Sequence, residues 1–329
     1  MHKRLWALIL VGFAGCSSSD EVQLLNASYD PTRELWRHIN RAFAADYHAK
    51  TGARVVIRQS HGGSGSQART IIDGLDADVA TLATWYDTDA MRRKGLMPAG
   101  WEERLPERSL PFYSTIVFVV RKGNPKNIRD WPDLIKPDVS VITPNPMTSG
   151  NGKLSFLAAW GAVRHRGGSA ADAETYIAKL YGNVLALDTA ARGATVTFAQ
   201  RNLGDVHITW ENEAHLEVKE SRGRVEIVYP PISIKAEPHV AVVDANVDRK
   251  GTRAAAEAYM AFLYTDEGQE IIGKHHYRPI NAEIRKKYTA LQDIELFSLS
   301  SFVTGWDEAQ SRFFSDGGVF DRIYARKAR

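Results

Sequence analysis

Residues 144–153, PNPMTSGNGK, place small and polar groups where a turn would present free backbone N–H donors. They follow an apolar, β-branched run at residues 139–143 and precede a stretch, LSFLAAWGAV, in which apolar side chains recur at helical spacing. The pattern predicts a strand, a turn, and a helix that starts near Ser149, Gly150 and Asn151. A helix start binds an oxyanion through its unpaired N–H groups and the helix dipole. For an isolated turn of this kind, an ordinary N-cap by Ser149 is the commoner explanation.

Three further turns share this chemistry. Residues 26–30 end a predicted strand and lead into a helix, and residues 189–193 do the same after the strand VLALD. Residues 61–66, HGGSGS, are rich in glycine, which lets the backbone approach a ligand closely. One such turn is a weak signal, because turns before helices are common. Four of them at strand ends favour a concave nest of N–H donors.

Motifs for catalysis or metal binding are incomplete in this sequence. Residues 62–66, GGSGS, lack the final glycine of a nucleophile elbow. Met147 stands where a phosphate loop requires glycine, and Leu154 replaces its Ser or Thr. His61 and the pair at 275–276 show no metal-ligand spacing with other ligands. We therefore expect no catalytic residue, no metal site and no cofactor, and interpret these histidines as solvated or structural.

Three aromatic residues need separate interpretations. Phe156 and Trp160 lie on the predicted helix after the first turn, where core packing is the better explanation. Trp210 ends a strand beside Glu211 and Glu213. It is either a core residue or a donor whose indole N–H points into a cleft.

Composition bounds the class of protein. The chain has 329 residues, enough for two domains, and its 44% apolar content supports real cores. Its 42 basic and 39 acidic residues are well mixed and give a formal charge of +3. Since no basic block stands out, we expect no nucleic-acid partner.

The N-terminus carries an export pattern. A positive segment at residues 2–4 precedes a short apolar run at residues 5–15, too short to span a bilayer. Cys16, the only cysteine, follows directly, so the segment resembles a bacterial lipoprotein signal, although Phe13 stands where an aliphatic residue is usual. We expect residues 1–15 to be removed, Cys16 to be lipidated and residues 16–21 to form a tether to the membrane. Ordinary secretion with a free thiol is the alternative.

The order of the elements predicts an α/β protein. Strands and helices alternate from residue 22, which indicates a parallel sheet with right-handed crossovers, and a second α/β series starts near residue 115. The loop between strand 54–58 and the next helix is expected at residues 59–66. Two lobes with a ligand cleft at the carboxyl ends of their strands follow from this order. We expect lobe 1 at residues 22–114 and 240–304, lobe 2 at residues 115–239, and a C-terminal helical segment at residues 305–329.

Several long, ordered segments carry a family resemblance. They are LLNASYDPTREL (24–35), VVIRQSHGGSGSQA (55–68), TIVFVVRKGNPK (115–126), VSVITPNPMTSGNGK (139–153), LAAWG (157–161), TWENEA (209–214), PISIKAEP (231–238), EAYMAFLY, GQEII and YRP within 257–279, and DGGVFD (316–321). In these segments the chain resembles the periplasmic sulfate-binding proteins that feed ABC importers. The resemblance covers essentially everything after the signal.

This resemblance implies a type II periplasmic-binding-protein fold whose two lobes close on one dehydrated sulfate held by neutral donors. The implied donors are the backbone N–H groups of Asp30, Ser64, Gly150, Asn151 and Ala191, the hydroxyl of Ser149 and the indole of Trp210. The family has glycine at the position of Asn151, where an N–H is still available and Asn tolerates left-handed geometry. Arg192, beside Ala191, is expected to support the site without touching the anion.

The expected function is high-affinity binding of sulfate or thiosulfate in the periplasm and its delivery to the permease subunits of an ABC importer. The resemblance implies a monomer that is not an enzyme. Another tetrahedral oxyanion, such as molybdate, tungstate or phosphate, is the first alternative. A hydrolase is the second, and the missing elbow glycine and metal cluster argue against it.

Overall fold

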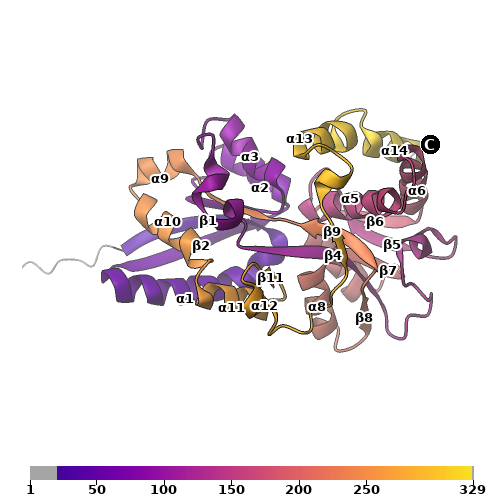
Figure 1. Ribbon diagram of the computed structural model, residues 1–329, viewed down its shortest axis with the longest axis horizontal. Coiled ribbons are helices and arrows are strands. Elements are labelled where there is room, and N and C mark those ends of the chain that lie inside the picture. The colour runs from indigo at the N-terminus through magenta and orange to yellow at the C-terminus, as the bar shows by residue number, and fades with distance from the viewer. Residues whose placement is uncertain (1–20, 328–329) are drawn as a thin grey trace, which may run out of the picture.

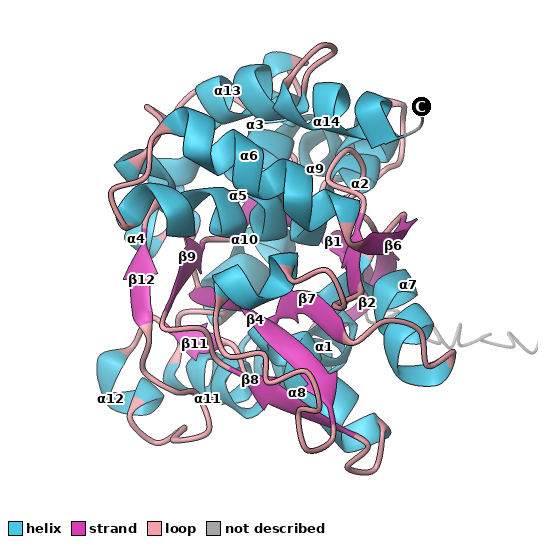
Figure 2. Cartoon of the chain, turned by 90° about the vertical axis from the view of Figure 1, so that its right-hand side faces the viewer, coloured by secondary structure: helices cyan, strands magenta, loops and turns pink. Residues whose placement is uncertain are grey.

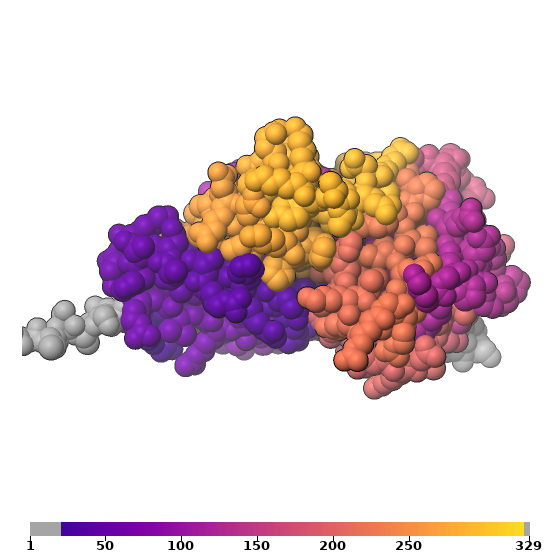
Figure 3. All heavy atoms as spheres, turned by 90° about the horizontal axis from the view of Figure 1, so that it is seen from below, coloured from indigo at the N-terminus to yellow at the C-terminus, as the bar shows by residue number. Residues whose placement is uncertain are grey.

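The computed structural model describes residues 21–327, and the expectations for residues 1–15 and Cys16 lie outside them. Two β-sheets, each with its own helices, form two lobes (Figure 1). Figure 3 shows the same division from below: indigo and orange residues form one end, and magenta to salmon residues form the other. The chain is therefore an α/β protein of two lobes, as expected.

The first lobe is built on a four-stranded sheet of order β10-β3-β1-β2. The first three strands in the chain are parallel, and the last is antiparallel to β3. The strands are β1 (Glu21–Tyr29), β2 (Arg54–Gly62), β3 (Val79–Leu82) and β10 (His239–Val242). The helices are η1 (Asp30–Thr32), α1 (Arg33–Thr51), α2 (Ser64–Ile72), α3 (Trp85–Arg93), η2 (Trp101–Arg104), α4 (Pro106–Ser109), α9 (Asp244–Lys250), α10 (Arg253–Phe262), α11 (Asp266–Lys274) and α12 (Ala282–Arg285). Apolar residues of α1, α10 and α11 pack on this sheet to make its core.

The second lobe is built on a larger sheet of order β12-β9-β4-β7-β5-β6, with β8 and β11 also paired to β4. Its strands are β4 (Phe112–Arg121), β5 (Val141–Pro144), β6 (Val184–Asp188), β7 (Val206–Trp210), β8 (Val225–Val228), β9 (Ile232–Ala236), β11 (Arg278–Pro279) and β12 (Glu295–Phe297). Its helices are η3 (Trp131–Ile135), α5 (Gly150–His165), α6 (Ala170–Gly182), α7 (Ala191–Thr195), η4 (Val196–Gln200), α8 (Glu211–Glu220), η5 (Leu299–Ser301), α13 (Trp306–Ala309), η6 (Gln310–Phe314) and α14 (Val319–Lys327). Helices α5, α6 and α14 lie on one side of β4 and β7, and α8 lies on the other (Figure 1, Figure 2).

Phe156 and Trp160 are core residues, as expected. Phe156 is fully buried and Trp160 nearly so, and both contact the ring of Phe313 from the C-terminal segment. This segment thus packs on α5 and belongs with the second lobe. Within residues 21–327, no helix has both the length and the apolar character to cross a bilayer.

The structure differs from the sequence expectations in several elements. Residues 59–66 are not a loop, because β2 stays in register with β1 as far as Gly62 and α2 begins at Ser64. After residues 26–29, which end β1, Asp30 is the first residue of the 3-10 turn η1, and the helix α1 follows it. The short strands β9, β11 and β12 were not anticipated. The strand β12 pairs with β9 in the second sheet, although residues 240–304 were expected in lobe 1, and the exact lobe boundaries stay a prediction.

Candidate functional site

The start of α5 lies at the junction of the two lobes. Ser149 caps the helix, and its hydroxyl accepts a hydrogen bond from the N–H of Gly152 at 3.4 Å. Ser149, Gly150 and Asn151 are all buried. The sequence therefore places a helix N-terminus, with its unpaired N–H groups, inside the protein and not at its surface.

Two helix starts from different lobes meet here. A Cβ atom added to Gly150 would lie 2.4 Å from the Cβ of Ala83 and 3.1 Å from that of Ser64, both in the first lobe. A Cβ added to Gly63 would lie 2.4 Å from the carbonyl oxygen of Thr148. The lobes are in close contact at this point, and only glycine fits at positions 63 and 150 without a shift.

The hydroxyl of Ser64 is engaged in the protein. It donates to Oδ2 of Asp87 at 2.7 Å and accepts from the N–H of Ala83 at 3.0 Å. Asp87 also accepts from Nζ of Lys153 at 3.0 Å, which joins the two lobes through a buried ion pair. Burial alone would raise the pKa of Asp87, but Lys153 and Ser64 outweigh it and lower that pKa. Because its hydroxyl is already engaged, the donor that Ser64 can offer a ligand is its backbone N–H.

Asp30 and Arg192 join the lobes on the other side of the cleft. Oδ2 of Asp30 accepts from the backbone N–H of Arg192 at 3.1 Å, and Oδ1 accepts from Nε of Arg33 at 2.8 Å. Nη2 of Arg192 lies 3.1 Å from Glu34 and 3.3 Å from Glu213. The carboxylate of Asp30 is therefore held by the protein, and Ala191 lies next to the residue that contacts it. Arg192 thus links the lobes, and its supporting role at the anion site stays a prediction.

Trp210 is fully buried at the end of β7, with its ring 5.5 Å from that of Tyr29. Its indole nitrogen Nε1 has no hydrogen-bond partner among residues 21–327. Leaving a buried donor unpaired costs about 1–3 kcal/mol, so an acceptor is expected beside it. The indole is thus suited to bind an anion.

Asn151 connects α5 to the strand that carries Trp210. Its Nδ2 donates to the hydroxyl of Thr209 at 3.3 Å, and its Oδ1 accepts from the hydroxyl of Ser155 at 3.1 Å. Asn151 lies in a right-handed helix and is absent from the residues with positive φ. The expectation that its tolerance of left-handed geometry matters is wrong.

The seven predicted donors are thus linked by a chain of contacts. Ser64 lies against Gly150, and Asn151 donates a hydrogen bond to Thr209, the residue before Trp210. Trp210 packs on Tyr29, the residue before Asp30. Asp30 accepts a hydrogen bond from the backbone N–H of Arg192, the residue after Ala191. No donor uses a cationic side chain. Their assignment as ligands of the anion stays a prediction.

Charged groups near this site are paired or neutralised by burial. Burial raises the pKa of Glu213 to about 8, because desolvation outweighs the attraction of Arg192. His61 bonds to Ser28 and Gln59, which makes it a structural residue. Across residues 21–327, no group of three or more His, Cys, Asp or Glu side chains is placed to hold a metal ion.

Sequence reasoning missed the residues that join the lobes. Lys153 belongs to the turn motif itself, but its partner Asp87 lies 66 residues earlier in the chain. Glu34, Tyr29 and Glu213 were likewise not assigned a role at the site. No local pattern marks such pairs, since they form only when the lobes come together.

The two α/β lobes around a shared cleft have the type II periplasmic-binding-protein fold, as do structurally similar solute-binding proteins. The sequence profile of the family described as bacterial extracellular solute-binding protein matches residues 36–278. The chain therefore belongs to this family, whose members bind solutes for transport and are not enzymes.

Relatives with known names agree with this assignment. The chain is 53% identical over 309 residues to the sulfate-binding protein of Escherichia coli K12, covering 93% of this chain and 94% of that protein. It is 46% identical over 329 residues to the thiosulfate-binding protein of Pseudomonas aeruginosa PAO1, covering 98% and 99%. The structure of the sulfate-binding protein SubI from Mycobacterium tuberculosis H37Rv matches with a TM-score of 0.81 and 29% identity, covering 89% of this chain and all of that one.

Proposed function

We propose that the protein binds sulfate, or thiosulfate, as a dianion in the cleft between its lobes and delivers it to the permease of an ABC importer. The observation that carries this proposal is the buried indole N–H of Trp210, which lacks a partner among the described residues beside the buried start of α5. The names of relatives at 53% and 46% identity support the same ligand class.

A site made only of donors suits this ligand. Sulfate at neutral pH carries two charges and offers only acceptors, whereas hydrogen phosphate also carries a proton that needs an acceptor. The carboxylate oxygens of Asp30 and Asp87 already accept hydrogen bonds from protein groups. Each hydrogen bond to a charged partner contributes about 1.5–3 kcal/mol. Several of them together reach the roughly −8 kcal/mol of micromolar binding.

Isothermal calorimetry on residues 17–329, freed of bound anion, tests this function. We expect tight one-to-one binding of sulfate or thiosulfate that phosphate does not displace. Tight binding of molybdate or phosphate with no heat from sulfate would leave the fold assignment intact and would contradict sulfate as the ligand. The absence of binding heat with every one of these anions would contradict the anion site itself.

Two substitutions test the donors. Ser149→Ala and Trp210→Phe each remove one donor and are expected to weaken sulfate binding about tenfold or more with the fold retained. Ser149→Ala also removes the N-cap of α5, so its melting temperature should fall. Ser311→Ala and Trp306→Phe change the same residue types outside the cleft and serve as controls. Unchanged sulfate affinity in both cleft variants would contradict the site assignment.

We also propose that the mature protein is a monomer in the periplasm, anchored to the membrane by lipid on Cys16. Support comes from the sequence alone, since Cys16 lies outside the described residues. Labelled palmitate should enter the wild-type chain and not Cys16→Ser. Sedimentation of residues 17–329 should give the mass of one chain, and a dimer at micromolar concentration would overturn the monomer.

A further inference from the structure

A buried ion pair joins the lobes where the chain crosses between them. Arg278 lies between α11 and α12 of the first lobe, and Glu211 begins α8 of the second. Nε and Nη2 of Arg278 donate to the two carboxylate oxygens of Glu211 at 2.7 and 2.8 Å, and these side chains are 4% and 0% exposed. Such a fork of two parallel hydrogen bonds fixes the orientation of both groups, and a lysine cannot reproduce it.

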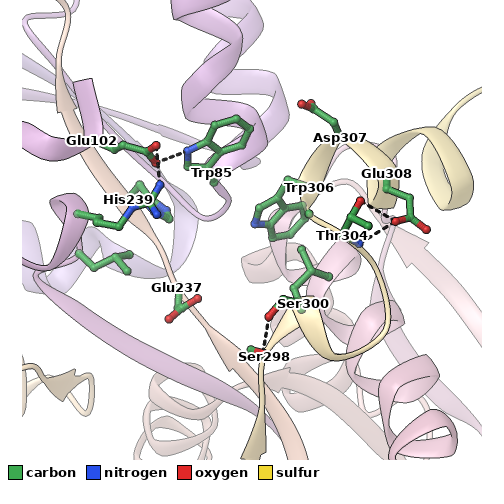
Figure 4. A pocket seen from close by; sticks show the side chains of 14 residues that line it. Trp85, Glu102, Glu237, His239, Ser298, Ser300, Thr304, Trp306, Asp307 and Glu308 are labelled. Atoms are coloured by element: carbon green, nitrogen blue, oxygen red, sulfur yellow. Dashed lines mark hydrogen bonds and ion pairs between the residues drawn. The ribbon is translucent and has the colours of Figure 1, made fainter. Parts of the chain in front are cut away.

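The ion pair at the cavity between the first lobe and the C-terminal segment is of a different kind (Figure 4). There Glu102 is paired with Arg108, whose side chain is 69% exposed. Exposed pairs contribute little to stability, whereas a buried charge that loses its partner is costly. We therefore expect a substitution in the buried fork to be felt at neighbouring residues, and one at the exposed pair to have little effect.

The backbone also holds Arg278 at the crossing. In β11 it pairs with Tyr113 at the start of β4, where the chain enters the second lobe. Its Nη2 donates in addition to the carbonyl oxygen of Gln292 at 2.6 Å, in the segment that leads from α12 to β12. Because the chain joins the lobes at this point, they cannot separate here when the cleft opens. The fork should therefore persist in the open and the closed state.

Glu211 ties this fork to Trp210. Trp210 ends β7, where it pairs with Ile116 of β4, and Glu211 is the next residue. The turn from strand to helix thus falls at Trp210, and no side chain caps this helix start. The strand fixes Trp210 on one side, and the fork fixes it on the other. A change in the fork is therefore expected to move the indole, whose N–H lacks a partner among residues 21–327.

We propose that Arg278 is a positioning residue of the anion site. Acting through Glu211, it holds the indole N–H of Trp210 in place before an anion arrives. This inference rests on the proposed function, in which most donors belong to the second lobe. They are Ser149, Gly150, Asn151, Ala191 and Trp210, against Asp30 and Ser64 of the first lobe. An anion that meets donors already in position loses less affinity to ordering them.

A mutant cycle with Trp210, measured by calorimetry with sulfate on residues 17–329, tests this role. Arg278→Lys keeps the charge and loses the fork, and Glu211→Gln keeps the shape and loses the charge. We expect each to weaken sulfate binding about fivefold or more in the wild-type background, and less than about twofold in Trp210→Phe. A purely structural loss would lower the affinity by the same factor in both backgrounds. Equal losses in both backgrounds, or unchanged affinity in both single variants, would overturn the proposal.

A matched control exists at the surface of the first lobe. Arg253 forms the same kind of fork with Asp248, at 2.7 and 2.8 Å, but these side chains are 34% and 62% exposed. Arg253→Lys should therefore leave the sulfate affinity unchanged. A loss in this control as large as that of Arg278→Lys would overturn the special place of the buried fork.

The indole N–H signal of Trp210 in the NMR spectrum of the anion-free protein provides a test without sulfate. We expect Arg278→Lys and Glu211→Gln to shift or broaden this signal. The signal of Trp131, whose indole donates to the carbonyl oxygen of Ile232 at 2.7 Å, should stay in place and show that the fold is kept. An unmoved Trp210 signal, or movement of both signals, would overturn the positioning role. A wild-type chain that binds no sulfate would contradict the proposed function, whereas this measurement would still decide what holds the indole.

Discussion

The two sides of the cleft hold the lobes together by different chemistry. On one side, which we call the small-residue flank, small residues bring the two lobes into close contact around one buried ion pair. Its members are Gly63, Ser64, Ala83 and Asp87 of the first lobe and Thr148, Gly150 and Lys153 of the second. On the other side, which we call the titratable flank, longer side chains meet. Its members are Asp30, Glu34 and His276 of the first lobe and Arg192, Glu213 and His215 of the second.

This difference assigns different tasks to the flanks. The small-residue flank has no spare space, because a single added carbon at Gly150 would overlap Ala83. It therefore decides how closely the lobes approach, and with that the position of the α5 N–H groups. The titratable flank adapts through rotamers and protonation, so it decides how the closed state responds to pH.

The largest expected effect is that of Gly150→Ala on the small-residue flank. Its methyl group would lie 2.4 Å from the Cβ of Ala83, so the lobes cannot reach the observed contact. Overpacking at this rigid contact destabilises the closed state by about 3 kcal/mol or more. We therefore expect calorimetry to show at least a hundredfold loss of sulfate affinity, on the order of 3 kcal/mol. Gly182→Ala, where nothing lies within 4 Å of the added carbon, is the matched control. Wild-type affinity in Gly150→Ala would show that the flank is soft and that the contrast between flanks is false.

Lys153→Met is expected to weaken sulfate binding about tenfold to a hundredfold. It leaves Asp87 buried between the lobes without its cation, and an unpaired buried charge destabilises the closed state by a few kcal/mol. Adding Asp87→Asn removes that charge and should restore part of the affinity. Calorimetry on the two single variants and the double variant gives the coupling energy. Purely additive losses would mean that the ion pair does not link the lobes in solution.

Local patterns in the sequence were enough to predict the start of α5, but not the contacts between lobes. Ser149 and Gly150 follow an apolar strand and precede a helical pattern, so their place at a helix start is a matter of neighbours in the chain. The pairing of Lys153 with Asp87 and the stacking of His215 on His276 depend on how the lobes meet. The sequence predicted a loop at residues 59–62, which instead form the end of β2. Their pairing with β1 keeps them extended, and nothing in their own composition indicates a strand.

A smaller, pH-dependent effect is expected from the titratable flank. The rings of His215 and His276 stack across the lobes with centroids 4.0 Å apart. Burial lowers the pKa of His215 to about 4, with His276 and then Arg278 adding to the shift, and burial followed by Lys219 lowers that of His276. Nε2 of His215 also lies 3.1 Å from the hydroxyl of Tyr229, and His275 beside them contacts His38.

The sign of this pH effect follows from the neutral imidazoles. With the lobes apart, the pKa of His215 returns toward its ordinary value near 6.5. The neutral histidine pair therefore stabilises the closed state fully above pH 6.5, and this stabilisation is lost as the pH falls toward 4. We expect wild-type sulfate affinity to fall several-fold between pH 7 and pH 5, and His276→Gln to reduce that loss, since burial still lowers the pKa of His215 in the variant. Glu213 acts in the opposite direction, because its raised pKa favours closure at low pH, so the informative quantity is the difference between variant and wild type. A wild-type pH profile in His276→Gln would rule out the histidine pair as the cause.

The smallest effect is expected at Asn151, which belongs to neither flank. Its backbone N–H lies in the first turn of a right-handed helix, and Asn151→Gly leaves that donor in place. The side chain bonds to Thr209 and Ser155, so its loss should lower the melting temperature, since two buried hydroxyls lose a partner and a helix gains a glycine. Sulfate affinity should change less than about threefold, because no donor to the anion is removed and Trp210 keeps its packing on Tyr29. A large loss of affinity with an unchanged melting temperature would instead make the amide of Asn151 a ligand of the anion.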